Sequence, residues 1–230
     1  MRQAGFGKDA LQSWDPRTAL GQYLFLRRIV NERGEIANPN LWTPTPAADQ
    51  VAWMEKVFGP DGYKALRDAA AAFDEITFQV AEYAHDSGTI SDEIWRTQIV
   101  PNKGNYAAFV VVHHLQSDEL SGKMFQQVGT FSEVANPFDG TIMKLYAMNR
   151  LAAVNRVKQG IRDFMAKDPA TTWEQVNLVG PARVPAKQAG MNEDFLYLLE
   201  DGQAQAYLVP KNQALAVSNH DVGGLADFFS

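Results

Sequence analysis

The sequence predicts an α+β fold that is predominantly helical, an antiparallel helix bundle with a small β-sheet that includes a C-terminal hairpin. Apolar residues recur every three or four positions through residues 63–84 and again through 137–164. Near the C-terminus, an Asp-Gly pair at 201–202 separates two short apolar runs. These patterns are the main sequence signals of helices and hairpins. We therefore expect a helical bundle region at 1–104 and a mixed helix and strand region at 105–230, packed together as one compact unit.

Composition narrows the class of protein. The chain has 230 residues, of which 46% are hydrophobic and 21% charged, so it can bury a core of ordinary size. A formal net charge of -6 disfavours a generally basic surface for nucleic acid, which we expect as a partner only indirectly. The absence of cysteine excludes disulfides, thiolate metal sites and a cysteine nucleophile.

The sequence lacks the apolar segments that direct a chain to a membrane. Residues 1–9 contain no continuous apolar stretch of the signal-peptide kind, and the longest apolar run, 107–112, is far shorter than the roughly 20 residues of a membrane span. We therefore predict a protein made in the cytoplasm, with no membrane span and no cleaved signal.

Three helices are expected in the first third of the chain. Asp15 caps a helix that Pro16 begins and Gly34 ends, and a loop follows at 35–44. A second helix begins at Thr45-Pro46 and ends at Gly59-Pro60. The third has a regular apolar seam suited to packing between helices. Its seam residues are Tyr63, Leu66, Ala70, Phe73, Thr77, Val80 and Ala84.

The middle of the chain changes from a helical pattern to a strand pattern and back again. Gly88 ends the seam helix, Ser91 caps a short helix that reaches Trp95, and a turn follows at 101–105. Residues 106–115 are rich in β-branched side chains and predict a buried strand. Asn136-Pro137 then begins a long helix, whose apolar residues are spread around it and predict cover on more than one side.

The C-terminal part is expected to contain most of the sheet. A short helical turn is predicted around 173–176, followed by a loop rich in glycine and proline at 180–190. Residues 195–199 and 206–209 flank Asp201-Gly202, which favours the tight turn of a β-hairpin. After Ala214 the chain ends at Ser230 within an apolar stretch that has the pattern of a helix cut short.

The histidines are the first candidates for chemistry. His113-His114 and the nearby Asp118-Glu119 have the side chains of a metal site, but adjacent residues of a strand point to opposite faces, so the two histidines cannot easily share one ion. His85-Asp86 lies near a helix C-terminus, where a favourable interaction with the helix dipole is the simpler explanation.

Two further sets of residues have the composition of active sites. Ser218, His220 and Asp221 match the side chains of a serine hydrolase, but without a Gly-x-Ser-x-Gly motif. Six carboxylates could form a glycosidase-type pair, although a solvated helix face is the default explanation. They are Glu55, Asp61, Asp68, Asp74, Glu75 and Glu82. The chain has neither a Walker loop nor a Gly-x-Gly-x-x-Gly motif. We assign no catalytic, cofactor-binding or metal-ligating residue.

Tryptophans near helix starts and loops could anchor a partner, but more commonly fix loops onto the core. They are Trp14, Trp42, Trp53, Trp95 and Trp173.

The order of these elements resembles the helical regions of the very large polyvalent proteins of bacteriophages and conjugative elements. The resemblance covers most of the chain and departs from the family pattern at Ala107-Ala108, where a Val-Pro pair is typical. Its motifs are Tyr23-Leu24-Phe25-Leu26-Arg27-Arg28, the long helix ending at Gly88, Ile90-Ser91-Asp92-Glu93-Ile94-Trp95, Asn105-Tyr106, Asn136-Pro137 with Asn155-Arg156, the Asp201-Gly202 hairpin and Tyr207-Leu208-Val209-Pro210.

The resemblance implies a non-enzymatic bacteriophage or mobile-element protein, a virion-associated or ejected structural domain that works through protein–protein interaction. Its partners would be copies of itself in a homo-oligomer or other virion components, and the chain would be a segment of a longer polypeptide or a shortened relative. Two alternatives stay open: a hydrolase whose site is assembled near His113 and His114, and a phage-encoded binder of a host protein, since negative charge suits capture of a basic partner.

Overall fold

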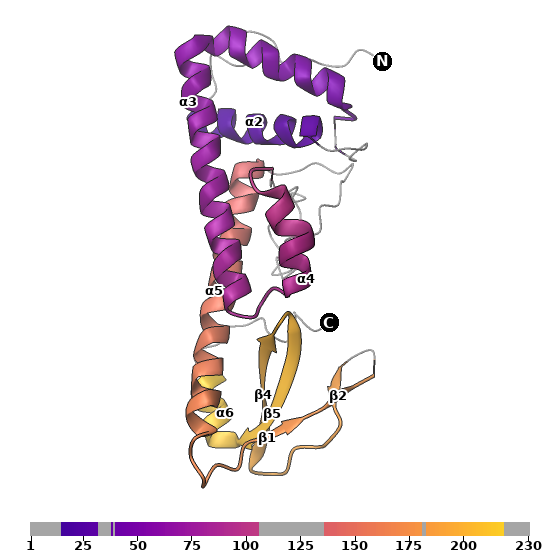
Figure 1. Cartoon of the computed structure of the whole chain (residues 1–230), viewed down its shortest axis with the longest axis vertical. Helices are drawn as coiled ribbons and strands as arrows, with labels where there is room; N and C mark the ends of the chain where they lie inside the picture. The colour runs from indigo at the N-terminus through magenta and orange to yellow at the C-terminus, as the bar shows by residue number, and fades with distance from the viewer. Residues whose placement is uncertain (1–14, 32–37, 39, 106–135, 181–182, 219–230) are drawn as a thin grey trace. The chain divides into compact units, whose positions relative to one another are not determined.

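The computed structural model describes residues 15–31, 38, 40–105, 136–180 and 183–218 (Figure 1). It confirms an α+β fold that is mostly helical and has a small antiparallel sheet. Its residues group into two compact units. Unit 1 comprises Met1–Gln79 and Pro101–Tyr146, and unit 2 comprises Val80–Val100 and Ala147–Ser230. The expected regions 1–104 and 105–230 divide the chain by secondary structure rather than by contacts, and that division stays a prediction.

Helix α2 (Pro16–Asn31) begins where the sequence predicts. The Asp15 carboxylate accepts a hydrogen bond from the Thr18 backbone N–H at 2.9 Å, which satisfies one of the free donors of the first turn. That bond holds the pKa of Asp15 below its usual value.

Helix α3 (Pro44–Asp86) changes direction at Gly59, which has a non-helical backbone with φ 69° and ψ 174° (Figure 1). Glycine adopts this positive φ without the steric penalty of a Cβ, and Pro60 cannot supply the N–H that would continue the first segment. The predicted helix end at Gly59-Pro60 is therefore confirmed, and the second segment carries the apolar seam.

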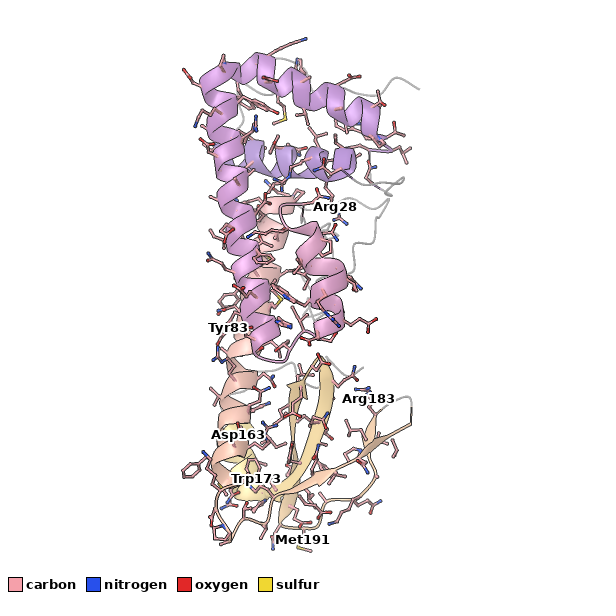
Figure 2. The ribbon with its side chains drawn as sticks, in the orientation of Figure 1. Arg28, Tyr83, Asp163, Trp173, Arg183 and Met191 are labelled. Atoms are coloured by element: carbon pink, nitrogen blue, oxygen red, sulfur yellow. The ribbon has the colours of Figure 1, made fainter. Side chains whose placement is uncertain are left out.

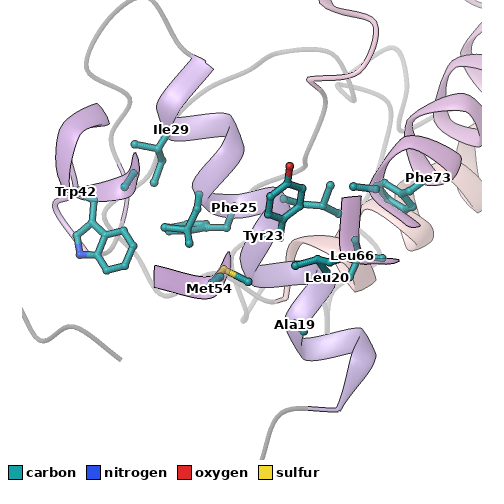
Figure 3. Close-up of a cluster of buried hydrophobic side chains, with 13 residues drawn as sticks. Ala19, Leu20, Tyr23, Phe25, Ile29, Trp42, Met54, Leu66 and Phe73 are labelled. Atoms are coloured by element: carbon teal, nitrogen blue, oxygen red, sulfur yellow. The ribbon is translucent and has the colours of Figure 1, made fainter. Parts of the chain in front are cut away.

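The core of unit 1 forms where α2 meets the two segments of α3 (Figure 3). The seam prediction holds at Leu66, Ala70, Phe73 and Thr77, all of which are buried. At the border of the core, Arg27 binds Asp74 through two hydrogen bonds of 2.7 Å each. The buried side chains of this cluster are Ala19, Leu20, Tyr23, Leu24, Phe25, Leu26, Ile29, Trp42, Ala47, Met54, Leu66, Ala70 and Phe73.

Three short helical segments follow α3. Ser91 caps α4 (Asp92–Ile94) by accepting a hydrogen bond from the Ile94 N–H at 3.3 Å, as predicted. A π-helical turn η1 (Trp95–Ile99) and a 3-10 turn η2 (Val100–Asn102) come next. The predicted turn after Pro101 ends at Gly104, whose φ is 82°.

Helix α5 (Pro137–Met165) begins as predicted, with the Asn136 side chain accepting a hydrogen bond from the Phe138 N–H at 3.0 Å. The expectation of cover on more than one side holds in part: Ile161, on the side of the helix opposite Ala152, packs against a buried cluster of unit 2. The buried side chains of α5 lie on one face and include Leu145, Met148 and Ala152. Large apolar side chains on the other face stay exposed: Ile142, Met143, Tyr146, Val157 and Phe164.

The sheet of unit 2 contains β1 (Glu174–Val176), β5 (Gln203–Pro210) and β4 (Glu193–Glu200) in the spatial order β1-β5-β4, all antiparallel. The predicted hairpin is confirmed: Glu200 pairs with Gln203 across a two-residue turn. Both turn residues have positive φ, 48° for Asp201 and 69° for Gly202, as a type I′ turn requires.

The predicted helical turn around 173–176 is wrong. Glu174–Val176 instead forms strand β1, whose register with β5 runs from Glu174 opposite Leu208 to Val176 opposite Ala206. Pairing with a distant strand overrides the local preference of this segment. Val176 is buried as a result.

A short ribbon and a last helix complete unit 2. Strands β2 (Leu178–Val179) and β3 (Val184–Pro185) form the ribbon, and α6 (Lys211–Ser218) follows β5 directly. Helix α6 and the sheet share a small core that also receives side chains from α5 and from the segment before β1. Its members are Leu196, Val209, Ala214 and Val217, with Ile161, Trp173 and Tyr207 packed against them. The predicted strand at 106–115 and the chain after residue 218 lie outside the described residues.

Candidate functional site

The most organised polar site of the described chain lies inside unit 2, where α5, the end of α3 and the β4–β5 hairpin meet. Its centre is Asn155 of α5, a fully buried side chain with 0% exposure. We call this site the Asn155 junction and define it by Asn155, Gln159, Ser87 and Leu199.

The amide of Asn155 uses both its donor and its acceptor. Its Nδ2 donates to the backbone carbonyls of Ser87 at 2.6 Å and Leu199 at 2.9 Å. Its Oδ1 accepts a hydrogen bond from the Leu199 N–H at 2.7 Å. One side chain thus satisfies both backbone groups of Leu199 and joins the loop after α3 to the end of β4. Buried backbone polar groups carry a high cost when they are left without such partners.

Gln159, one helical turn after Asn155, reinforces the junction. Its Nε2 donates to the Ser87 carbonyl at 2.9 Å and to the Leu199 carbonyl at 2.8 Å. Gly88 must be a glycine here, because its φ is +74° and an added Cβ would stand 3.1 Å from both the Gln159 side chain and the Leu199 carbonyl oxygen. The loop after α3 is therefore built to let these polar groups meet.

The turn of the β4–β5 hairpin also forms hydrogen bonds with the loop after α3 and with the start of α4. The Gly202 N–H donates to the Gly88 carbonyl at 2.9 Å, and Asp201 Oδ1 accepts from the Asp92 N–H at 2.6 Å. A Cβ on Gly202 would lie 2.9 Å from the Ser91 backbone nitrogen. The Asp-Gly turn thus binds the start of α4 while it joins β4 to β5.

His85 lies beside this junction, in the last turn of α3. Its Nε2 lies 2.7 Å from Asp92 Oδ1, its Nδ1 lies 3.7 Å from Asp86 Oδ1, and its ring stacks on Trp95 at 4.8 Å between centroids. A general base needs a ring nitrogen directed at a reacting group, whereas Asp92 already binds Nε2. The arrangement suits a link between α3 and α4, beyond the helix-end interaction that the sequence predicts.

Most of the other candidate residues lie either outside the described residues or in separate ion pairs. His113, His114, Asp118, Glu119, His220 and Asp221 lie outside the described residues, as does Trp14, and nothing is described of the Ser218 side chain. Asp68 pairs with Lys64 on the exposed surface of α3, and Glu75 of α3 pairs with Lys103 in the turn after η2. Asp74 departs from the expected solvated face, because Arg27 binds it in a half-buried pair. In the part of the chain that the structure describes, no three side chains of metal-binding type gather around one point.

The described tryptophans lie against other side chains, and a role in fixing loops stays a prediction, since Trp53 lies within α3 and Trp95 begins η1. Trp42 and Trp53 contact the core of unit 1, and Trp173 contacts the core of unit 2. Trp95 stacks on His85.

Sequence reasoning missed the role of Asn155. One signal was present: Leu145, Met148 and Ala152 form the buried face of α5, and Asn155 continues their alternation of three and four residues. A polar residue at an apolar position of a helix predicts a buried hydrogen-bonded group. Its partners, two backbone segments 44 and 68 residues away, are set by tertiary structure alone.

Comparison with known protein families, with curated proteins and with solved structures finds no match. Among the described residues, no helix combines the length and apolar character that crossing a membrane requires.

Proposed function

We propose that this chain is a non-enzymatic structural or interaction protein of a bacteriophage or mobile element, virion-associated or ejected, that acts by binding other proteins. The observation that carries the proposal is the exposed face of α5 in unit 2, where Val157 is 55% and Phe164 73% exposed on the same side of one helix. Exposed large apolar side chains that share a face are typical of interaction surfaces.

The Asn155 junction supports the proposal because it fixes the helix that carries this face. Side-chain hydrogen bonds hold α5 to the loop after α3 and to β4 at two successive turns of the helix. A surface that is already ordered loses less conformational entropy when a partner binds. The class of protein named in the proposal comes from the resemblance of the sequence to the helical regions of polyvalent proteins, and that resemblance stays a prediction.

Quantitative mass spectrometry of purified phage particles or conjugation complexes from the producing host tests the proposal. The chain is expected at a fixed copy number per particle, and the purified protein is expected to form an assembly that buries apolar surface. Absence from the particles together with failure to assemble with itself or with virion proteins would overturn the proposal.

A further inference from the structure

One face of α5 in unit 2 carries small and apolar residues at the spacing of a helix–helix contact, although the described residues of the unit do not cover it. Ala153, Val157, Gly160 and Phe164 follow one another at steps of four, three and four, so they lie along one line of the helix. Val157 and Phe164 are exposed, the buried residues Met148 and Ala152 lie on another face, and Ile161, beside the line, packs against the core shared by α6 and the sheet. The line therefore has the spacing of a helix–helix seam without a helix against it in unit 2.

Gly160 is the informative member of this line. A Cβ added at Gly160 would meet no atom within 4 Å, and its backbone does not have the positive φ that favours glycine. Glycine inside a helix reduces stability relative to alanine. Unit 2 therefore has room for a larger side chain at this position, and a glycine there leaves the helix backbone open to close approach by another chain.

Two charges of opposite sign flank the line on one side. Arg156 and Asp163 are both exposed and lie seven residues apart, which places them on the same edge of the helix. Arg156 lies over the Tyr83 ring at 5.3 Å, and Asp163 accepts a hydrogen bond from Arg162 at 2.9 Å, yet the Asp163 side chain stays 61% exposed. Figure 2 shows Tyr83 on α3 and Asp163 on α5.

We propose that a second copy of this chain packs on this face, with the two α5 helices antiparallel about a two-fold axis level with residues 158–159. This arrangement sets Arg156 beside the partner's Asp163, and by symmetry Asp163 beside the partner's Arg156. It also sets Val157 opposite the partner's Gly160 and Ala153 opposite the partner's Phe164, so a large side chain faces a small one at each level. A parallel pair would place each charge level with its own copy and lose this match.

The inference rests on the proposed function and names the partner. One helix face of this length buries less than the roughly 1,200 Å² of a stable complex, so the dimer is expected to be weak and to exchange rapidly. Its exposed ion pairs make it salt-sensitive, because ions screen charges at a protein surface.

Analytical ultracentrifugation of the full chain over a hundredfold concentration range tests the dimer. The wild type is expected to pass from monomer to dimer. Arg156→Glu and Asp163→Arg should each weaken the dimer about tenfold or more, because each places like charges together. Combining both substitutions in one chain should restore it, and mixing the two single variants should give heterodimers. Lys211→Glu, the same charge reversal on exposed α6, should leave dimerisation unchanged.

Gly160→Ala tests whether a partner helix packs closely at this position or whether Gly160 is only an exposed helix residue. Alanine should raise the melting temperature of the monomer through helix propensity and weaken the dimer by blocking close approach. Circular dichroism establishes that every variant is folded. A wild type that stays monomeric throughout, or single variants that neither lose the dimer nor complement each other, would overturn this inference. Detection in purified particles distinguishes the two proposals: a monomeric protein found in particles would overturn the dimer alone, and a dimer absent from particles would count against virion association and leave the dimer standing.

Discussion

The cores of the two units are held together differently. Among the described residues of unit 1, a cluster of 13 buried apolar side chains joins α2, Trp42 and α3 (Figure 3). Unit 2 also has an apolar core, but the loop after α3 and the end of β4 meet through the side-chain amides of Asn155 and Gln159. Apolar contacts tolerate exchange for side chains of similar volume, whereas a buried hydrogen-bond network is unfavourable once one member is lost. Single substitutions at the polar junction should therefore act more strongly than conservative ones in the apolar core.

The largest effect is expected from Asn155→Leu. It leaves the Leu199 N–H without an acceptor and removes two of the hydrogen bonds to the Ser87 and Leu199 carbonyls. We expect the free energy of unfolding to fall by roughly 3 to 4 kcal/mol, since the orphaned Leu199 N–H costs about 1 to 3 kcal/mol and each of the two lost hydrogen bonds about 0.5 to 1.5 kcal/mol. Gln159 still donates to both carbonyls.

Urea unfolding followed by circular dichroism and tryptophan fluorescence measures this loss. Asn149→Leu is the matched control, because Asn149 is an exposed asparagine on the same helix. Its effect should stay within about 0.5 kcal/mol. Equal effects of the two substitutions would mean that the junction contributes no stability.

The Arg27–Asp74 pair tests how much a polar interaction contributes to the stability of unit 1 beside its apolar core. The two side chains are 15% and 13% exposed, so Asp74→Ala leaves a largely desolvated arginine without its carboxylate. We expect a loss of roughly 2 to 3 kcal/mol, below the range for fully buried pairs. The double variant Arg27→Met with Asp74→Leu should be more stable than Asp74→Ala alone. If the double variant unfolds at lower urea than Asp74→Ala, the ion pair has a larger role in unit 1 than this comparison assigns to it.

Lys144 should give the smallest effect, and one that depends on pH. Burial, followed by the nearby positive charge of Arg28, lowers the pKa of Lys144 from its usual 10.5. Between the folded and unfolded pKa values the unfolded chain holds a proton that the folded chain has released, so stability rises with pH there. At pH values below the pKa of Lys144 in the folded protein, Lys144→Gln should therefore raise the stability of unit 1 by a small amount. This gain should shrink as the pH approaches 10.5. Urea midpoints of both proteins between neutral and alkaline pH measure the difference. A gain that is constant with pH would contradict the assignment to charge burial.

Local signals explain what could be predicted from the sequence. The cap at Asp15, the break at Gly59-Pro60, the start of α5 at Asn136 and the turn at Asp201-Gly202 each depend on a few neighbouring residues. Their conformations follow from backbone sterics and capping, so sequence alone is enough.

Distant partners explain what could not. Strand β1 exists because β5 pairs with it, Asp74 is half-buried because Arg27 reaches it from α2, and Asn155 has its role because two remote backbone segments converge on it. The alternation along α5 marks Asn155 as a buried polar residue, but no local pattern identifies the partner in any of these three cases. The exposed apolar line on α5 was visible as periodicity, but only the structure shows that unit 2 leaves it uncovered.

Hydrogen exchange at the Leu199 amide tests the role of the Asn155 junction most directly, because this N–H donates to a side chain, Asn155 Oδ1. In the wild type, the Leu199 amide should be protected as strongly as the β4–β5 ladder. In Asn155→Ala, protection of Leu199 and of the loop after α3 should fall, while the amides of α2 in unit 1 stay unchanged. Rapid exchange at Leu199 in the wild type, or equal protection in both proteins, would contradict the account.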